Sequence, residues 1–173
     1  MTMADELAIA LNAYEGDNPW EDVIRAGGDW RLDEAATEAA DPQGSSDLAI
    51  LTDGSAVVYD ETRREWVTRS PEWVREHILE PALRRYLSGE DLYAVPEQVS
   101  TVWETFIRAK FPALAQALDN ARWQPLNGPG VWDPNTMSLT EAVLDYLANA
   151  NGDEQAAVAA VKRDYEESVR ESR

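Results

Sequence analysis

The 173-residue sequence has no cysteine and a single histidine, His77. The absence of cysteine excludes thiolate nucleophiles, disulfides, cysteine zinc sites and thiol redox motifs. A serine-histidine-aspartate mechanism would have to use His77, and a histidine-rich metal site is excluded. Because any two of the 33 acidic residues could be paired for acid-base catalysis, such a pair is not specific. We expect no catalytic residue, no metal and no cofactor, and an enzyme is the less favoured alternative.

Long apolar runs, targeting segments and phosphate-binding loops are lacking as well. No 18 apolar residues run together, and the start, "MTMADELAIALNAYEGD", has neither a basic segment nor an apolar one of the signal-peptide type. No glycine-rich stretch is followed by lysine, and the calcium-loop-like "NANGDE" at 149–154 has Ala160 where the last carboxylate is needed. We expect a cytoplasmic protein that binds no membrane.

Acidic residues are abundant and unevenly distributed. The net charge is −18, of which residues 1–62 carry −13, residues 63–125 carry 0 and residues 126–173 carry −5. Such a charge repels nucleic-acid phosphates, so direct nucleic-acid binding is not expected. Adaptation to a salt-loving host should acidify every exposed element, whereas the middle of this chain is neutral. A local acidic face is therefore favoured, and halophilic adaptation remains the alternative.

The pattern of apolar residues predicts an α+β fold, a mostly helical domain with a small three-stranded antiparallel sheet at about 48–69. Strand periodicity is found in "LAILT", "AVVYD" and "EWVTR", and Asp53-Gly54 between the first two is a strong hairpin signal. Both faces of the second strand are apolar, so we expect it to be central. We predict one domain over residues 1–173, with an acidic helical segment 1–46, a meander 47–69 and a helical body 70–173.

Caps and breakers predict where the helices begin and end. Asn18-Pro19 and Ser70-Pro71 each have the form of an N-cap followed by proline, and Pro81 should kink or restart the second of these helices. The alanine-rich "DWRLDEAATEAAD" is expected to be an exposed helix. Further helices are predicted at 4–14, 97–110, from Pro112, from the capping box "SLTE" and after "NGDE", with a loop at 122–137.

Seven tryptophans are several times the average share for a chain of 173 residues. Trp20 and Trp30 are flanked by acids, a combination that suits binding to a basic protein surface, because tryptophan supplies binding energy and carboxylates supply steering. The alternative is that both side chains fold inward. The predicted partner-binding residues are Asp17, Trp20, Glu21, Asp22, Asp29, Trp30, Asp33, Glu34 and Glu38.

These features favour a non-enzymatic, acidic protein-binding module. Its most specific form is an inhibitor from a phage or other mobile element that mimics nucleic acid and occupies a basic site on a nucleic-acid-binding protein. A structural or adaptor subunit of a larger assembly is the alternative that composition leaves open.

A further alternative comes from a family resemblance. The order "LTDGSAVVYDETRREWVTRSPEWVREHILEPALRRYL", followed by "LNGPGVWDPNTMSL", resembles the segment that precedes the helicase of phage and plasmid primase-helicases. In that family an aromatic-bearing hairpin leads into a helical bundle and then an Asn-Gly-containing turn. The resemblance covers roughly residues 47–140 and leaves out the nucleotide-binding helicase portion. It implies a replication-associated accessory module without ATPase activity.

Overall fold

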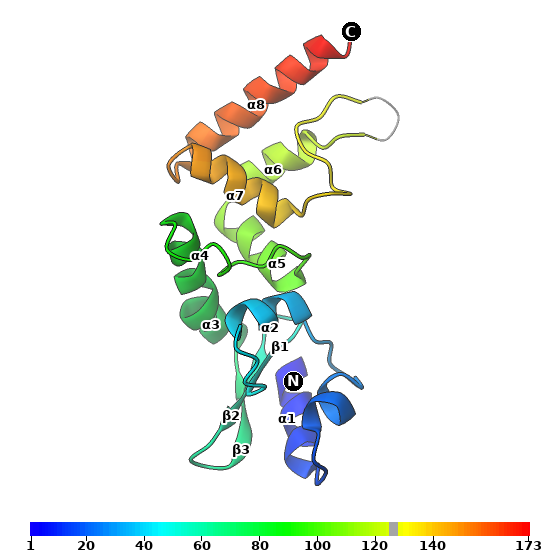
Figure 1. Ribbon diagram of the computed structural model, residues 1–173. Coiled ribbons are helices and arrows are strands. Elements are labelled where there is room, and N and C mark those ends of the chain that lie inside the picture. Colours follow the sequence, from blue (N-terminus) through cyan, green and yellow to red (C-terminus); the bar gives the residue numbers. More distant parts are fainter. Residues whose placement is uncertain (125–127) are drawn as a thin grey trace. The chain divides into compact units, whose positions relative to one another are not determined.

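The computed structural model describes residues 1–124 and 128–173, and the protein has the predicted α+β fold, mostly helical with one three-stranded antiparallel sheet (Figure 1). The chain forms two compact units, unit 1 (Met1–Trp103) and unit 2 (Glu104–Arg173). The division falls inside the segment predicted as one helical body, and the prediction of a single domain stays a prediction. The sheet belongs to unit 1.

The sheet has the predicted strands and order. β1 (Leu48–Ile50), β2 (Ala56–Asp60) and β3 (Glu65–Arg69) are antiparallel, with β2 in the centre. At the first turn Gly54 has a φ of 90°, which glycine adopts without strain. The Asp53 carboxylate accepts from the backbone N–H of Ser55 at 3.0 Å, so this acid serves the turn as predicted.

Both edges of the sheet are covered. Helix α1 (Met3–Ala13) packs against β3, and the side-chain amide of its Asn12 accepts from the N–H of Trp66 at 2.8 Å and donates to the carbonyl of Trp66 at 3.0 Å. At the other edge the N–H of Asp33 bonds the carbonyl of Ile50 at 2.9 Å. The backbone groups that an edge strand presents to other chains are therefore partly occupied within unit 1.

Two short helical elements connect α1 to the sheet. The first is a single π-helical turn, η1 (Trp20–Ile24), where the Asn18 side chain accepts from the N–H of Glu21 as its predicted capping role requires. The second, α2 (Glu34–Ala40), corrects the expectation of an exposed alanine-rich helix, because Ala35, Ala36 and Thr37 are buried. Small side chains let α2 approach β1 closely, and the Thr37 hydroxyl accepts from the N–H of Ile50 at 3.0 Å.

After the sheet the chain forms one helical run of α3 (Pro71–Val74), the π-helical turn η2 (Arg75–Leu79) and α4 (Glu80–Leu87). Pro81 has no N–H for the carbonyl four residues back and its ring would clash there. The run adopts a wider turn just before it, in which the N–H of Glu80 bonds the carbonyl of Arg75. The predicted interruption at Pro81 is thus a π-turn, and the helix continues.

Helix α5 (Thr101–Lys110) starts four residues later than the predicted 97. Ser100 accepts from the N–H of Trp103 at 3.1 Å and so caps the helix. Val99 falls within the predicted helix 97–110, but it lies before the cap and is 74% exposed. The cap at Ser100 therefore determines where this helix begins.

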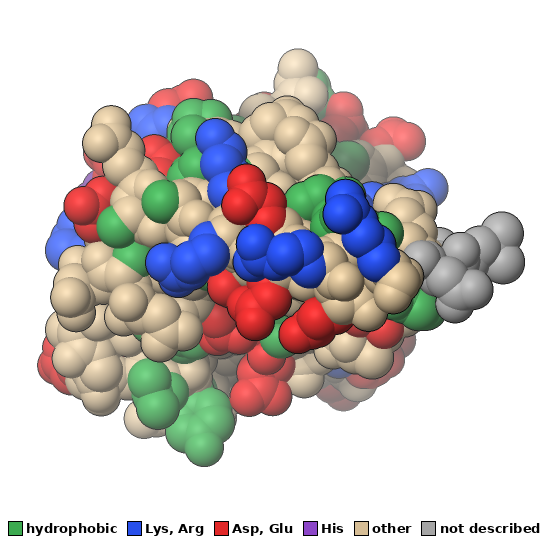
Figure 2. Space-filling view, turned by 90° about the horizontal axis from the view of Figure 1, so that it is seen from above, with side chains coloured by type: hydrophobic (Ala, Val, Ile, Leu, Met, Phe, Trp, Pro, Cys, Tyr) green, Lys and Arg blue, Asp and Glu red, His purple; other side chains and the backbone are tan. Residues whose placement is uncertain are grey.

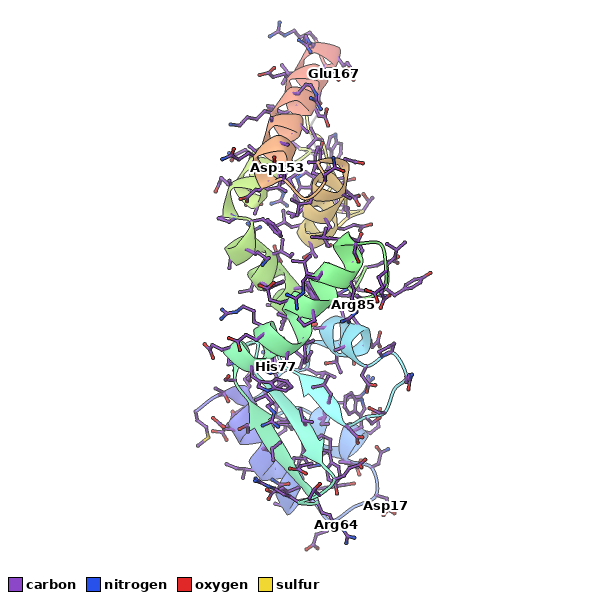
Figure 3. All side chains as sticks on the ribbon, turned by 90° about the vertical axis from the view of Figure 1, so that its left-hand side faces the viewer. Asp17, Arg64, His77, Arg85, Asp153 and Glu167 are labelled. Atoms are coloured by element: carbon purple, nitrogen blue, oxygen red, sulfur yellow. The ribbon has the colours of Figure 1, made fainter. Side chains whose placement is uncertain are left out.

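Unit 2 contains α6 (Pro112–Asn120), α7 (Leu139–Asn149) and α8 (Glu154–Glu171), which pack against one another. Ser138 of the predicted capping box accepts from the N–H of Glu141 at 3.1 Å. The last helix follows "NGDE" as predicted; Asp153 is its N-cap, and the helix carries the exposed Glu167 (Figure 3). The indole N–H of Trp132 donates to the carbonyl of Leu118 at 2.6 Å and attaches the predicted loop to α6. Residues 125–127 of that loop lie outside the described residues.

Every helix within the described ranges is too short or too polar to cross a membrane. In the same residues no group of three or more His, Asp or Glu is arranged to hold a metal ion.

Candidate protein-binding face

All nine residues predicted to bind a partner lie in unit 1, and the structure separates them by exposure. Six have exposed side chains, and we call this set of residues the acidic face: Asp17, Glu21, Asp22, Asp29, Glu34 and Glu38. Within the set, Glu21 and Glu34 share Arg25, and Glu34 and Glu38 line one hollow. Trp20 and Trp30 are partly buried, and Asp33 is buried. Figure 3 shows Asp17 at the same end of unit 1 as Arg64 of the β2–β3 turn.

Asp33 departs from the prediction, because its carboxylate is 5% exposed and serves the fold. One oxygen accepts from the N–H of Ala36 at 3.0 Å and caps α2. The other accepts from the hydroxyl of Ser100 at 2.8 Å and from the N–H of Val102 at 2.9 Å, in the first turn of α5. One carboxylate thus caps two helices from distant parts of the sequence, and it is not available to a partner.

The two tryptophans take the inward alternative in part. Trp20 and Trp30 both pack against the cluster of buried residues formed by α1, η1 and the sheet. The indole N–H of Trp30 donates to the carbonyl of Ile24 at 3.2 Å, which fixes the ring over the end of η1. Their first contribution is therefore to the core of unit 1, although part of each ring remains accessible.

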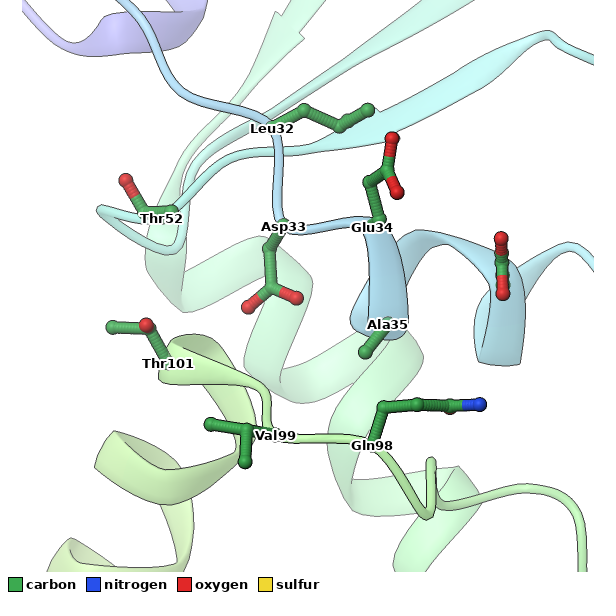
Figure 4. Close-up of a pocket in the computed structure, with 9 residues that line it drawn as sticks. Leu32, Asp33, Glu34, Ala35, Thr52, Gln98, Val99 and Thr101 are labelled. Atoms are coloured by element: carbon green, nitrogen blue, oxygen red, sulfur yellow. The ribbon is translucent and has the colours of Figure 1, made fainter.

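Two hollows flank the segment from Leu32 to Glu34. The first, of about 400 Å³, is lined by residues that include Glu34 and Glu38 of α2 together with Gln98, Val99 and Thr101. Figure 4 shows the Glu34 carboxylate directed away from Val99. The second, of about 360 Å³, is lined by Ile24, Arg25, Gly27, Trp30, Arg31, Leu32 and Glu34. Carboxylates of the acidic face and accessible apolar side chains therefore lie next to one another.

The acidic face contains both paired and unpaired carboxylates. Arg25 bridges Glu21 at 3.2 Å and Glu34 at 2.7 Å, and the hydroxyl of Tyr14 donates to Asp22. The bond to Asp22 is also the main reason why the pKa of Tyr14 is raised above its ordinary value.

Within the described residues, the carboxylates of Asp17, Asp29 and Glu38 have no hydrogen-bond or ion-pair partner. These three are available for cations from outside the molecule.

Three residues of the first hollow were not among the predicted binding residues, and they lie just before or at the start of α5. Gln98, Val99 and Thr101 line this hollow together with Glu34 and Glu38, although about 60 residues separate the two groups along the chain. The available signal was "QVST", in which Ser100 is a good N-cap and places Val99 outside the helix.

The charge differs between the two units. Residues 1–103 carry 22 acids and 8 bases, a net charge of −14, and residues 104–173 carry 11 and 7, a net charge of −4. Figure 2 shows a face on which lysine and arginine side chains are interspersed with acidic ones. The excess of negative charge is concentrated in unit 1.

Comparisons with protein-family models, with curated proteins and with solved structures found no match to this chain. The resemblance of residues 47–140 to the pre-helicase segment of primase-helicases therefore stays a prediction. Part of its Asn-Gly turn, Asn127, lies outside the described residues.

Proposed function

We propose that the protein is a non-enzymatic protein-binding module whose acidic face binds a basic surface of another protein. The observation that carries this proposal is the first hollow, whose lining includes Glu34, Glu38 and Val99, of which Val99 is 74% exposed. Lysine and arginine side chains combine an aliphatic stem with a cationic head. A hollow lined by both carboxylates and an exposed apolar side chain suits both parts of such a side chain.

The unpaired carboxylates of the acidic face support the same function. Asp17, Asp29 and Glu38 gain new partners when a basic surface docks, without first breaking an internal ion pair. The net charge of −14 on unit 1 steers a basic partner toward it, which raises the association rate and makes it sensitive to salt.

The specific mechanism we propose is competition with nucleic acid. The partner is a nucleic-acid-binding protein whose basic site is occupied by the acidic face, as expected of an inhibitor carried by a phage or another mobile element. Basic sites of this kind bind phosphates largely through charge, so closely spaced carboxylates can take the same place.

A pull-down tests this function. The full chain is immobilised, incubated with a lysate of the organism that encodes it, and washed at about 150 mM salt. The expected result is capture of a nucleic-acid-binding protein that is released by excess duplex DNA and at about 500 mM salt, because screening weakens exposed ion pairs. A partner that survives both treatments contradicts the mimic mechanism, and recovery of the protein alone favours a structural subunit.

A further inference from the structure

A third hollow in unit 1, of about 110 Å³, lies between α2 and the α3–α4 run. Most of its lining residues are apolar, namely Ile78, Trp103 and alanines of α2, α4 and the α4–α5 connection, and its only ionisable lining residues are His77 and Arg85. No acidic side chain lines it. This distinguishes the hollow within a unit that has a net charge of −14.

Two consecutive elements of the α3–α4 run line this hollow. His77 and Ile78 belong to the π-turn η2, and Ala82 and Arg85 belong to α4. Arg85 follows one turn after Ala82 on the same run, and Figure 3 shows His77 and Arg85 along it.

Contacts within the run hold the His77 ring in place. The imidazole is stacked on the indole of Trp73, with ring centroids 4.6 Å apart and planes 16° apart. Its Nδ1 is 3.0 Å from the carbonyl oxygen of Trp73. Because a carbonyl only accepts, Nδ1 carries the hydrogen of this bond. The imidazole ring therefore lines the hollow in an orientation that its two contacts with Trp73 hold.

The guanidinium of Arg85, by contrast, has no ion-pair or hydrogen-bond partner in residues 1–124 and 128–173. A planar guanidinium binds a carboxylate through two parallel hydrogen bonds. The unpaired guanidinium can therefore make a charged contact with a ligand, and the alanine-lined hollow beside it can hold an apolar part of the same ligand.

We propose that this hollow binds a small monocarboxylate, with the carboxylate on Arg85 and a short alkyl group in the alanine-lined interior. An apolar cavity of roughly 150 Å³ holds benzene. The smaller volume here, about 110 Å³, suits an alkyl group of three or four carbons. The proposal is independent of the acidic face, since neither Arg85 nor His77 belongs to it.

The test uses the histidine as reporter, because His77 is the only one in the chain and its imidazole C–H signals in an NMR spectrum are unambiguous. The full chain is titrated with butyrate at constant pH and ionic strength, and butanol and butylamine are titrated in parallel. The expected result is a saturable shift of the His77 signals with butyrate, and at least tenfold weaker binding of both uncharged and cationic analogues.

Matched variants identify the residues involved. Arg85→Ala should weaken butyrate binding about tenfold or more, whereas Arg84→Ala, an exposed neighbour that does not line the hollow, should leave it unchanged. Ala39→Leu fills the hollow from the partly buried side of α2 and should abolish binding in a folded protein, which circular dichroism checks. Equal effects of Arg84→Ala and Arg85→Ala, or a butyrate shift that never saturates, overturn the proposal.

Discussion

At the scale of single residues, Asp33 shows how a carboxylate that looks like a surface group can belong to the fold. Its neighbours Asp29 and Glu34 are exposed, and nothing in "DWRLDE" distinguishes the three acids. The difference lies in its partners, since the oxygens of Asp33 accept from Ala36 in α2 and from Ser100 and Val102 near the start of α5. The bond to Ala36 joins near neighbours and could be predicted from the local sequence, whereas the bonds to Ser100 and Val102 join distant parts of the chain and could not.

The substitution Asp33→Ala should lower the free energy of unfolding by about 2–4 kcal/mol, because it removes two caps and leaves buried N–H groups without an acceptor. Urea unfolding followed by tryptophan fluorescence measures the change. Asp29→Ala is the control, because Asp29 is exposed and unpaired within the described residues, and it should change stability by less than about 0.5 kcal/mol. Equal effects of the two substitutions on the free energy of unfolding would show that the Asp33 carboxylate does not stabilise the fold.

Asp5 gives a prediction about pH at the same scale. Its bonds to the backbone and the hydroxyl of Thr2 lower the pKa of the Asp5 carboxyl. A lowered pKa in the folded state means that Asp5 stabilises the protein above its unfolded pKa of about 3.9 and loses that contribution as the pH falls below it.

Acid unfolding of Asp5→Asn should therefore depend less on pH below about pH 4 than that of the native chain. Glu6→Gln is the matched control, because Glu6 is the next residue of the same first turn and its carboxylate has no hydrogen bond or ion pair within the described residues. Identical acid transitions for the native chain and Asp5→Asn would refute the role of the cap.

At the scale of elements, the strands and most helix starts could be predicted because each depends on neighbours in the chain. Alternating apolar residues and the Asp53-Gly54 turn were sufficient for the sheet. The burial of α2 could not be predicted in this way. Its alanines look too small to anchor a helix, and they are buried because other elements, β1 among them, pack against them.

The π-turns show the same limit. Pro81 marks a place where the α-helical bond pattern fails, but the sequence does not say whether the helix breaks, kinks or widens. Packing of Val74 and Leu79, both buried, keeps the run continuous on either side of the wide turn. The outcome depends on contacts made by the element as a whole.

In unit 2, Tyr146 of α7 donates to Asp164 of α8 at 2.8 Å. Burial, and then this bond, raise the pKa of the Tyr146 phenol. A raised pKa in the folded state stabilises the protein below the unfolded pKa of about 10, and the contribution is lost as the pH rises above it.

Tyr146→Phe should accordingly lower the free energy of unfolding at neutral pH by about 1 kcal/mol and weaken its dependence on pH above about pH 10. Thermal melts between pH 7 and 11 measure both. Tyr165→Phe on α8 removes a hydroxyl without a bond in the described structure and should have little effect. A Tyr146→Phe melt that parallels the native one at every pH contradicts this account.

At the scale of the whole molecule, the fold class and the part of the chain with the largest negative charge could be predicted from the sequence. Which residues form the candidate site could be seen only in the structure. Charge is countable along the chain, so a net charge of −13 on residues 1–62 pointed to this part of the protein. Asp33 is buried, and Val99 lines the same hollow as Glu38, because distant segments of the chain are in contact. Six of the nine predicted residues remain on the acidic face.

The most direct test of the acidic face compares two double charge reversals in the pull-down from lysate. Asp29→Lys with Glu38→Lys changes the acidic face, and Glu166→Lys with Glu167→Lys makes the same change in net charge on exposed residues of α8 in unit 2. Melting curves first confirm that both variants are folded.

If the partner binds the acidic face, capture of the basic partner should fall at least tenfold with the first variant at about 150 mM salt and should be unchanged with the second. Loss of the partner to the same extent with both variants would show that only net charge matters. Retention by both would show that the acidic face is not where the partner binds.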